Sequence, residues 1–238
     1  MNLFLLTNPL LEAYSGADPF GKGIFLSLLL LSIGTWIVFL QKFLSQKHAR
    51  AKGRQLITTF EKKRHHPLGL ETSTLNHPYA SLYNTLKSHA QELLQKNRSV
   101  LQERVPATLS SSDVEQLDTY LQSTLSTEIQ SMEKNLFVLS TIVSLAPFLG
   151  LLGTVWGILL TFQELQAGTG AIQSNTAMLG GLAMALGTTV FGLLVAIPAL
   201  VGYNYLKAST SQFAKEMEDF SQIMLANVEL QYRQIELK

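Results

Sequence analysis

The chain has 238 residues, of which only 15% are charged, and its formal net charge is +1. A balance this close to neutral gives no indication of nucleic-acid binding. Because the chain contains no cysteine, disulfides, thiolate metal sites and cysteine nucleophiles are excluded. Residues 23–41, 136–162 and 177–206 contain no Asp, Glu, Lys or Arg and are 19, 27 and 30 residues long. Since about 20 apolar residues suffice to cross a bilayer core, the sequence predicts three membrane-spanning helices.

The basic residues predict how these spans are oriented. Thirteen Lys and Arg residues lie between positions 42 and 135, none between 163 and 176, and four after 206. Loops rich in Lys and Arg stay in the cytoplasm, and the first 22 residues lack the basic region of a signal peptide. The expected order is a periplasmic amphipathic lead-in (1–22), a first span (23–44), a cytoplasmic helical loop (45–135), a second span (136–162), a periplasmic loop (163–176), a third span (177–206) and a cytoplasmic helical tail (207–238).

The long cytoplasmic segments have the pattern of helices. Ser112 and Glu115 have the spacing of a capping box. From Val114 to Leu136, apolar residues recur every three or four positions and form one stripe. We expect one unbroken helix from about residue 112 to 162, roughly 75 Å long, and a third span that likewise continues into the tail. The expected fold is all-α: a polytopic membrane protein with three transmembrane helices, two of them extended far into the cytoplasm as a helical bundle.

Small residues gather on one face of the second and third spans. Such faces let helix backbones approach closely within lipid, and this packing alone explains the glycines. A threonine in a span either bonds to a carbonyl of its own helix or presents its hydroxyl to a polar seam between helices or subunits. Pro147 and Pro198 favour the seam, because a proline inside a helix leaves a carbonyl without its usual partner. The second span carries Pro147, Gly150, Gly153, Thr154, Gly157 and Thr161 on this face, and the third carries Gly181, Ala185, Thr188, Gly192, Ala196 and Ala199, with Thr189 at its border.

Two segments, "APFLGLLGTVWGI" and "GLAMALGTTVFGLLVAIPALVGYN", resemble the paired signatures of the MotA/TolQ/ExbB proton-channel family. The resemblance is dense over residues 144–204, and the number of spans favours the ExbB/TolQ branch. The segments "SIGTWIVFLQKF" and "FAKEMEDFSQIM" look slightly more similar to TolQ than to ExbB. By this resemblance, Thr154 and Thr189 correspond to the two pore threonines of the family.

The resemblance also implies an assembly and a location. It implies a homo-oligomer, a pentamer, in the bacterial inner membrane around the single helices of an ExbD- or TolR-like partner that carries a membrane aspartate. Such a complex uses the proton motive force to do mechanical work on a TonB- or TolA-like protein that spans the periplasm. The sequence departs from the family at Met184, where a glutamate is usual.

The three charge-free runs contain no side chain that titrates near neutral pH, not even a histidine. Proton relays through membranes depend on such groups, and a threonine hydroxyl passes a hydrogen bond along but does not store a proton near neutral pH. A proton channel built from this chain therefore needs the titrating carboxyl of its partner, whose pKa a low-dielectric wall of Gly, Ala and Thr would raise. The alternative is a non-conducting scaffold for a partner helix, which Met184 supports. A secondary transporter is disfavoured by three spans without charge or inverted repeats.

Other residue clusters give weaker indications. All five histidines lie in the expected cytoplasmic loop; they are His48, His65, His66, His77 and His89. The adjacent pair His65 and His66 could suggest a metal site, but adjacent residues rarely chelate from one helix face and no cysteine assists, so we expect a solvated loop there. Lys62, Lys63 and Arg64 form ordinary positive-inside charge or, alternatively, contact anionic lipids. No phosphate-binding loop, nucleophile triad or nucleotide fingerprint occurs. We therefore expect neither an enzyme nor a cofactor.

Overall fold

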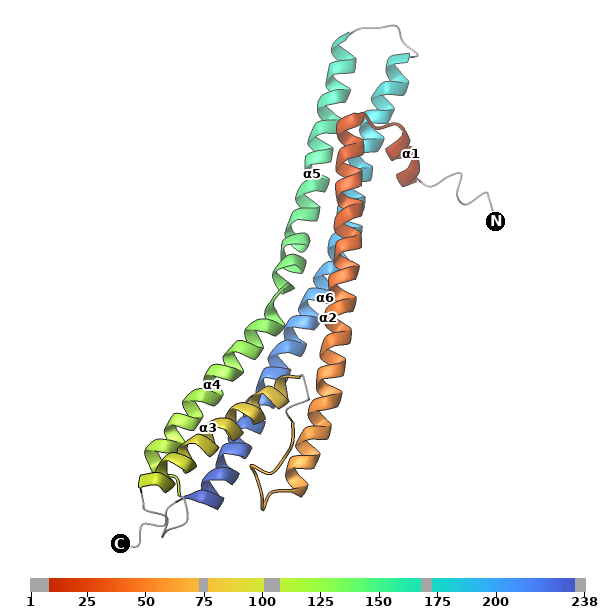
Figure 1. The fold of residues 1–238 in the computed structure, drawn as a ribbon. Coiled ribbons are helices and arrows are strands. Elements are labelled where there is room, and N and C mark those ends of the chain that lie inside the picture. Colours follow the sequence, from red (N-terminus) through yellow and green to blue (C-terminus); the bar gives the residue numbers. More distant parts are fainter. Residues whose placement is uncertain (1–8, 73–76, 101–107, 168–172, 234–238) are drawn as a thin grey trace. The chain divides into compact units, whose positions relative to one another are not determined.

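The computed structural model describes residues 9–72, 77–100, 108–167 and 173–233, and this part of the chain is built from helices (Figure 1). Within these ranges there is no strand, only an isolated parallel bridge between Leu109 and Arg233. The predicted all-α fold is confirmed. The helices are α1 (Pro9–Ser15), α2 (Pro19–Lys62), α3 (Pro78–Val100), α4 (Ser111–Glu133), α5 (Leu136–Ala167) and α6 (Gln173–Tyr232).

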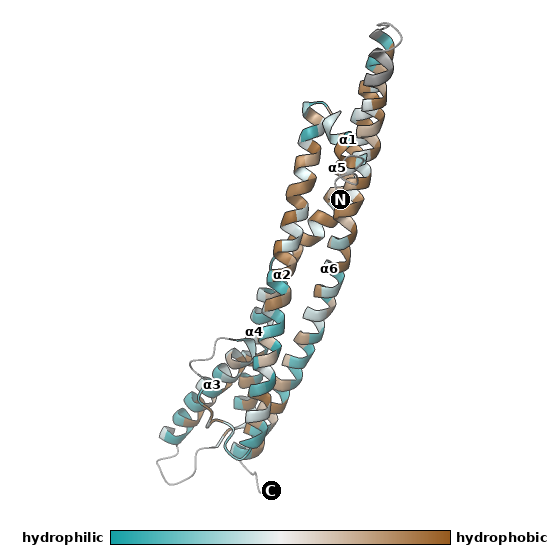
Figure 2. Cartoon of the chain, turned by 90° about the vertical axis from the view of Figure 1, so that its right-hand side faces the viewer, coloured by the Kyte–Doolittle hydropathy of each residue, from teal (hydrophilic) through white to brown (hydrophobic). Residues whose placement is uncertain are grey.

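Three helical stretches are long and apolar enough to cross a membrane, as the sequence predicts. They are Pro19–Lys62, Ser111–Gln166, which includes both α4 and α5, and Met178–Tyr232. Figure 2 shows long brown, hydrophobic runs in α2, α5 and α6. Parts of the lead-in (1–8) and of the expected periplasmic loop (168–172) lie outside the described residues.

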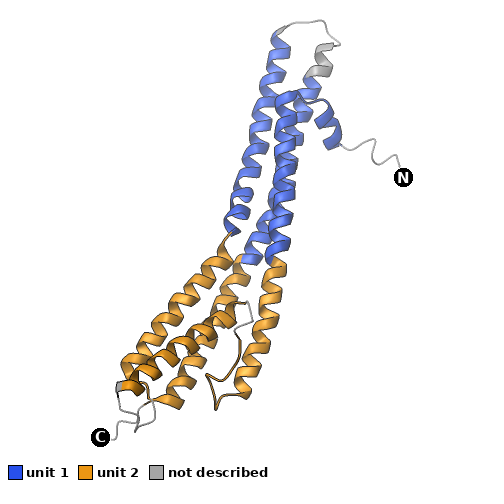
Figure 3. Cartoon of the chain, in the orientation of Figure 1, with its two compact units in different colours: residues 1–42, 135–206 blue, residues 43–134, 207–238 orange. Residues whose placement is uncertain are grey.

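The chain divides into two compact units (Figure 3). Unit 1 consists of Met1–Lys42 and Asn135–Leu206 and contains the three charge-free runs. Unit 2 consists of Phe43–Lys134 and Lys207–Lys238 and contains most of the charged residues. The helices α2 and α6 each contribute to both units, whereas α3 and α4 belong to unit 2 and α5 to unit 1.

Unit 2 has a core of leucine, methionine and aromatic side chains from all of its helices. The stripe predicted on α4 is buried there through Leu117, Leu121 and Leu125. Two of its ring contacts are edge-to-face, with centroids 5.7 Å apart for Phe60 and Phe220 and 5.3 Å apart for Tyr79 and Phe213. Burying such rings against leucines gives unit 2 a well-packed interior of its own.

The expectation of one unbroken helix from residue 112 to 162 is wrong. The helix α4 ends at Glu133, and α5 begins at Leu136. Between them Asn135 has a φ of 75°, in the left-handed region, which asparagine tolerates better than most residues. The apolar period continues across this point, so the pattern alone predicted a continuous helix.

The expected capping box at Ser112 and Glu115 is also wrong. The structure places the N-cap at Ser110, whose hydroxyl accepts a hydrogen bond from the backbone N–H of Asp113 (3.2 Å). The Asp113 carboxylate accepts the Ser110 backbone N–H in return (2.8 Å) and a bond from the Asn97 amide (2.9 Å). Partial burial raises the pKa of Asp113, but these bonds and nearby Lys96 outweigh it and lower the pKa overall.

His77 is buried and caps the start of α3. Its side chain is 8% exposed, and its Nδ1 accepts the backbone N–H of Ala80 (3.2 Å) at the start of α3. Burial, followed by the charge of Lys52, lowers the pKa of His77. The residue therefore favours its neutral form and acts as a cap for α3.

We expect Leu125→Asp to destabilise the protein by about 3 kcal/mol or more, because it loses apolar burial and places a carboxylate in the unit 2 core. The matched variant Thr127→Asp lies on the exposed side of α4 and should change stability by less than about 0.5 kcal/mol. Thermal unfolding of the purified variants measures both. Equal tolerance at the two positions would show that the stripe is not a packed face.

The left-handed residue at the end of α4 generates a second prediction. Asn135→Ala should destabilise the protein by about 1 kcal/mol, because an alanine side chain is strained at this backbone conformation. Asn135→Gly should retain the stability of the wild type, because glycine adopts it freely. An alanine variant more stable than the glycine variant would contradict the left-handed residue and indicate one continuous helix, since alanine is favoured over glycine inside a helix.

Candidate functional site

Within unit 1, α5 and α6 approach so closely that several positions have no room for a side chain. A Cβ built on Gly157 would lie 2.6 Å from the carbonyl oxygen of Gly181, and one on Gly192 would lie 2.7 Å from that of Ala146. Carbon atoms do not approach oxygen this closely without a shift of the backbone. The glycines therefore stand where the two backbones meet, on the faces that carry the small residues.

The remaining small residues complete this contact. A Cβ on Gly150 would lie 3.0 Å from the carbonyl oxygen of Thr188, and one on Gly153 would overlap the Thr188 side chain. A Cβ on Gly181 would lie 2.6 Å from the hydroxyl oxygen of Thr161. Ala185 is also buried and stands opposite Gly157.

Thr161 and Thr188 are buried, and their hydroxyls bond to carbonyl oxygens of their own helices, with that of Thr188 also 3.4 Å from the carbonyl oxygen of Gly150 on α5. Thr161 donates to the carbonyl oxygen of Gly157 (2.9 Å). The Thr188 hydroxyl lies 2.9 Å from the carbonyl oxygen of Ala185 and 3.0 Å from that of Met184. A buried hydroxyl with such partners is a stable packing element and leaves no donor for a ligand.

Thr154 and Thr189 lie in different surroundings, because both side chains are only partly buried. Thr154 donates to the carbonyl oxygen of Leu151 on its own helix (2.6 Å). Thr189 instead donates across to α5, to the carbonyl oxygen of Gly150 (3.2 Å). Because Gly150 precedes Thr154 by one helical turn, the hydroxyl of Thr189 reaches α5 about one turn away from Thr154.

The two prolines do not end their helices, since α5 continues through Pro147 and α6 through Pro198. Pro147 is half-buried. Pro198 is exposed, whereas Ala196 and Ala199 on the same helix are buried. Pro198 therefore lies away from the face on which those alanines pack.

Met184 is only 1% exposed and lies in an apolar cluster with Ala13, Ala17 and Phe25. Its methyl end occupies the space beside Gly21, where a Cβ would overlap it. An uncharged side chain suits these surroundings, because a carboxylate there would lose its hydration among apolar groups.

Sequence reasoning missed Asp18, which lies beside this cluster. Its carboxylate accepts the backbone N–H groups of Gly21 (2.9 Å) and Phe20 (3.3 Å) and thus caps α2. It also accepts the indole N–H of Trp156 on α5 (3.1 Å), and the Phe20 ring packs on that indole with centroids 4.5 Å apart. An aspartate directly before Pro19 is a typical helix start, but no local signal indicates a partner 138 residues away.

The sequence that forms α5 and α6 can be compared with the sequences of known proteins. The sequence profile of the MotA/TolQ/ExbB proton channel family matches residues 86–219, which is more than half of the chain. The chain belongs to the MotA/TolQ/ExbB proton channel family. The matched range includes the whole contact from Ala146 to Gly192, so the resemblance seen in the sequence is confirmed.

Relatives of the chain include proteins named for both members of the ExbB/TolQ branch. It is 28% identical to the biopolymer transport protein ExbB of Neisseria meningitidis strain MC58 over 206 residues, 86% of this chain and 90% of that protein. It is 46% identical to ExbB of Aquifex aeolicus over 77 residues, 32% of this chain and 51% of that protein. It is 39% identical to the Tol-Pal system protein TolQ of Haemophilus influenzae over 94 residues, 39% of this chain and 40% of that protein.

In this member of the MotA/TolQ/ExbB family, a larger residue at Gly153 should disturb the α5–α6 contact. We expect Gly153→Leu to destabilise the protein by about 3 kcal/mol, because the new side chain overlaps Thr188. Gly23→Leu is the matched control, since nothing lies within 4 Å of the added Cβ there. Size-exclusion chromatography and thermal unfolding in detergent measure assembly and stability. Normal behaviour of Gly153→Leu would contradict the close contact.

Proposed function

We propose that the chain is the oligomeric channel subunit of an inner-membrane complex that converts the proton motive force into mechanical work. Family membership and the names of its ExbB and TolQ relatives support a role in energy transduction for biopolymer transport. The orientation that the basic residues predict places the N-terminus in the periplasm and the charged unit 2 in the cytoplasm.

The composition of the spans supports a partner protein that supplies the titrating group. Their charge-free runs provide hydroxyls but no group that titrates near neutral pH. An ExbD- or TolR-like protein with one span and a membrane aspartate would supply the missing carboxyl. This chain would form a homo-oligomer, a pentamer in the family, around the partner's helix, and a TonB- or TolA-like protein would receive the work.

The single observation that carries this proposal is the placement of Thr154 and Thr189. Both lie in the paired stretch of α5 and α6, about one helical turn apart. Their side chains are only partly buried, unlike those of Thr161 and Thr188, although each hydroxyl donates to a backbone carbonyl oxygen. Their neighbours Leu151 and Val190 are 57% and 49% exposed on the isolated chain. A partner helix against this side would bring its carboxyl to two hydroxyls in an otherwise apolar wall.

A non-conducting scaffold is the second candidate. It is favoured by Met184, which is buried in an apolar cluster at the position where the family usually has a glutamate. Such a scaffold would hold the partner's helix by packing alone and would need neither threonine. The two functions therefore predict different effects of removing a threonine hydroxyl. A channel would lose proton flux, whereas a scaffold would keep its function.

We expect Thr154→Val and Thr189→Val each to permit assembly but to abolish proton flux, because valine keeps the volume and removes the hydroxyl. Thr→Ser at either position should retain much of the flux. Thr35→Val is the matched control, since Thr35 is buried in α2 and donates only to its own helix (2.9 Å). It should cost at most about 1 kcal/mol of stability and leave flux intact.

Flux is measured in liposomes that contain the chain together with its single-span partner. Wild-type flux in the Thr154→Val, Thr189→Val double variant would show that neither threonine lies on the proton path. Assembly without flux in the wild-type complex would instead favour the scaffold.

A further inference from the structure

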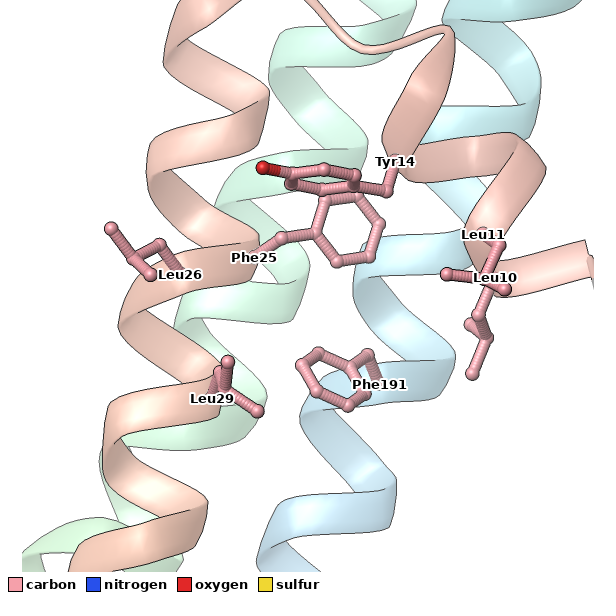
Figure 4. A pocket seen from close by; sticks show the side chains of 7 residues that line it. All are labelled: Leu10, Leu11, Tyr14, Phe25, Leu26, Leu29 and Phe191. Atoms are coloured by element: carbon pink, nitrogen blue, oxygen red, sulfur yellow. The ribbon is translucent and has the colours of Figure 1, made fainter.

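An apolar cavity of about 300 Å³ lies in unit 1 between α1, α2 and α6 (Figure 4). The short helix α1 contributes Leu10 and Leu11, α2 contributes Leu26 and Leu29, and Phe191 comes from α6. Phe25, 6% exposed, and Tyr14 complete the wall. Apart from the Tyr14 hydroxyl, none of these side chains carries a polar atom.

The cavity continues into an exposed apolar surface. Leu11, Leu26 and Leu29 line it and are 53%, 56% and 48% exposed. Leu26 and Leu29 belong to the charge-free run that begins at residue 23, so this surface faces hydrocarbon wherever α2 spans a membrane. The cavity thus opens to the lipid and not to water.

One edge of the cavity carries a positive charge. Lys22 is the last charged residue before the apolar run, and its ammonium lies 6.0 Å from the ring centroid of Tyr14. The Tyr14 ring in turn packs edge-to-face on Phe25, with centroids 5.8 Å apart. The exposed Lys22 makes no ion pair within the described part of the chain, and the nearby Asp18 carboxylate already accepts the N–H groups of Phe20, Gly21 and Trp156.

We propose that this cavity binds one acyl chain of an anionic phospholipid, whose phosphate lies against the Lys22 ammonium and the Tyr14 hydroxyl. The cation stands at the membrane surface and the leucine walls extend from it into the apolar run, which is the order of head and tail in a lipid. The site requires only that α2 spans the membrane, and it does not depend on proton conduction.

The polarity of the cavity favours an acyl chain over a peptide. An extended peptide would leave backbone N–H and C=O groups unpaired against the leucines, at high cost in free energy. An acyl chain has no such groups.

The test is native mass spectrometry of the full chain in detergent, delipidated and then titrated with dioleoyl phosphatidylglycerol. Leu29→Trp fills the cavity, and Leu30→Trp is the matched control, because Leu30 is 61% exposed on the same helix and does not line the cavity. We expect one phosphatidylglycerol per chain for the wild type and Leu30→Trp. Leu29→Trp should bind it about tenfold more weakly.

A second arm tests the headgroup contact with a substitution at an exposed position. The wild type should prefer phosphatidylglycerol to zwitterionic phosphatidylcholine about fivefold, the contribution of one lysine at a membrane surface, and Lys22→Gln should remove that preference. If Leu29→Trp does not fold, the headgroup preference of Lys22→Gln still tests the proposal.

Three results would overturn the proposal. Equal binding by Leu29→Trp and Leu30→Trp would place the lipid elsewhere on the surface. An unchanged headgroup preference in Lys22→Gln would remove the phosphate contact. Binding that occurs only after deletion of residues 1–8 would assign the cavity to the chain's own N-terminal segment.

Discussion

The contact between the backbones of α5 and α6 is the constraint on which the rest of unit 1 depends. Helices that pack through ordinary side chains keep their axes about 8–10 Å apart, but at Gly157 and Gly192 even a methyl group would collide with a carbonyl oxygen of the other helix. This proximity seals the Thr188 hydroxyl in the contact. It also lets the Thr189 hydroxyl reach the carbonyl oxygen of Gly150. The positions of these two hydroxyls therefore follow from the glycines.

The same constraint limits what the chain can do alone. A wall of Gly, Ala, Leu and Thr passes hydrogen bonds along but offers no group that gains and loses a proton near neutral pH. Met184 is buried in an apolar cluster, and the Asp18 carboxylate already accepts three N–H groups. In the proposed function the proton carrier therefore belongs to the partner. The chain supplies an apolar wall of low dielectric constant, two hydroxyl groups and a rigid support for the partner's helix.

The features that the sequence predicted correctly are those that depend on periodicity and on charge. Three charge-free runs predicted three candidate spans, and the period of small residues placed Gly150, Gly153 and Gly157 on one face. The stripe through Leu117 and Leu125 was likewise visible, and it is buried in unit 2. These patterns repeat on every turn of a helix, so many residues of a single sequence indicate the same feature.

The features that it did not predict depend on single residues or on contacts between distant segments. Asn135 interrupts the helix without a glycine or a proline to mark the place. Two overlapping capping spacings begin at Ser110 and Ser112, and only the structure distinguishes them. The bond from Trp156 to Asp18 joins residues whose local sequences contain no sign of each other.

The most direct test of the central claim, that the spans of this chain hold no proton-titrating group of their own, compares three liposome preparations under the same proton gradient. They contain the purified chain alone, the chain with its single-span partner, and the chain with a partner whose membrane aspartate is changed to asparagine. We predict flux only in the second preparation. Flux through the chain alone equal to that of the complete complex would contradict the account.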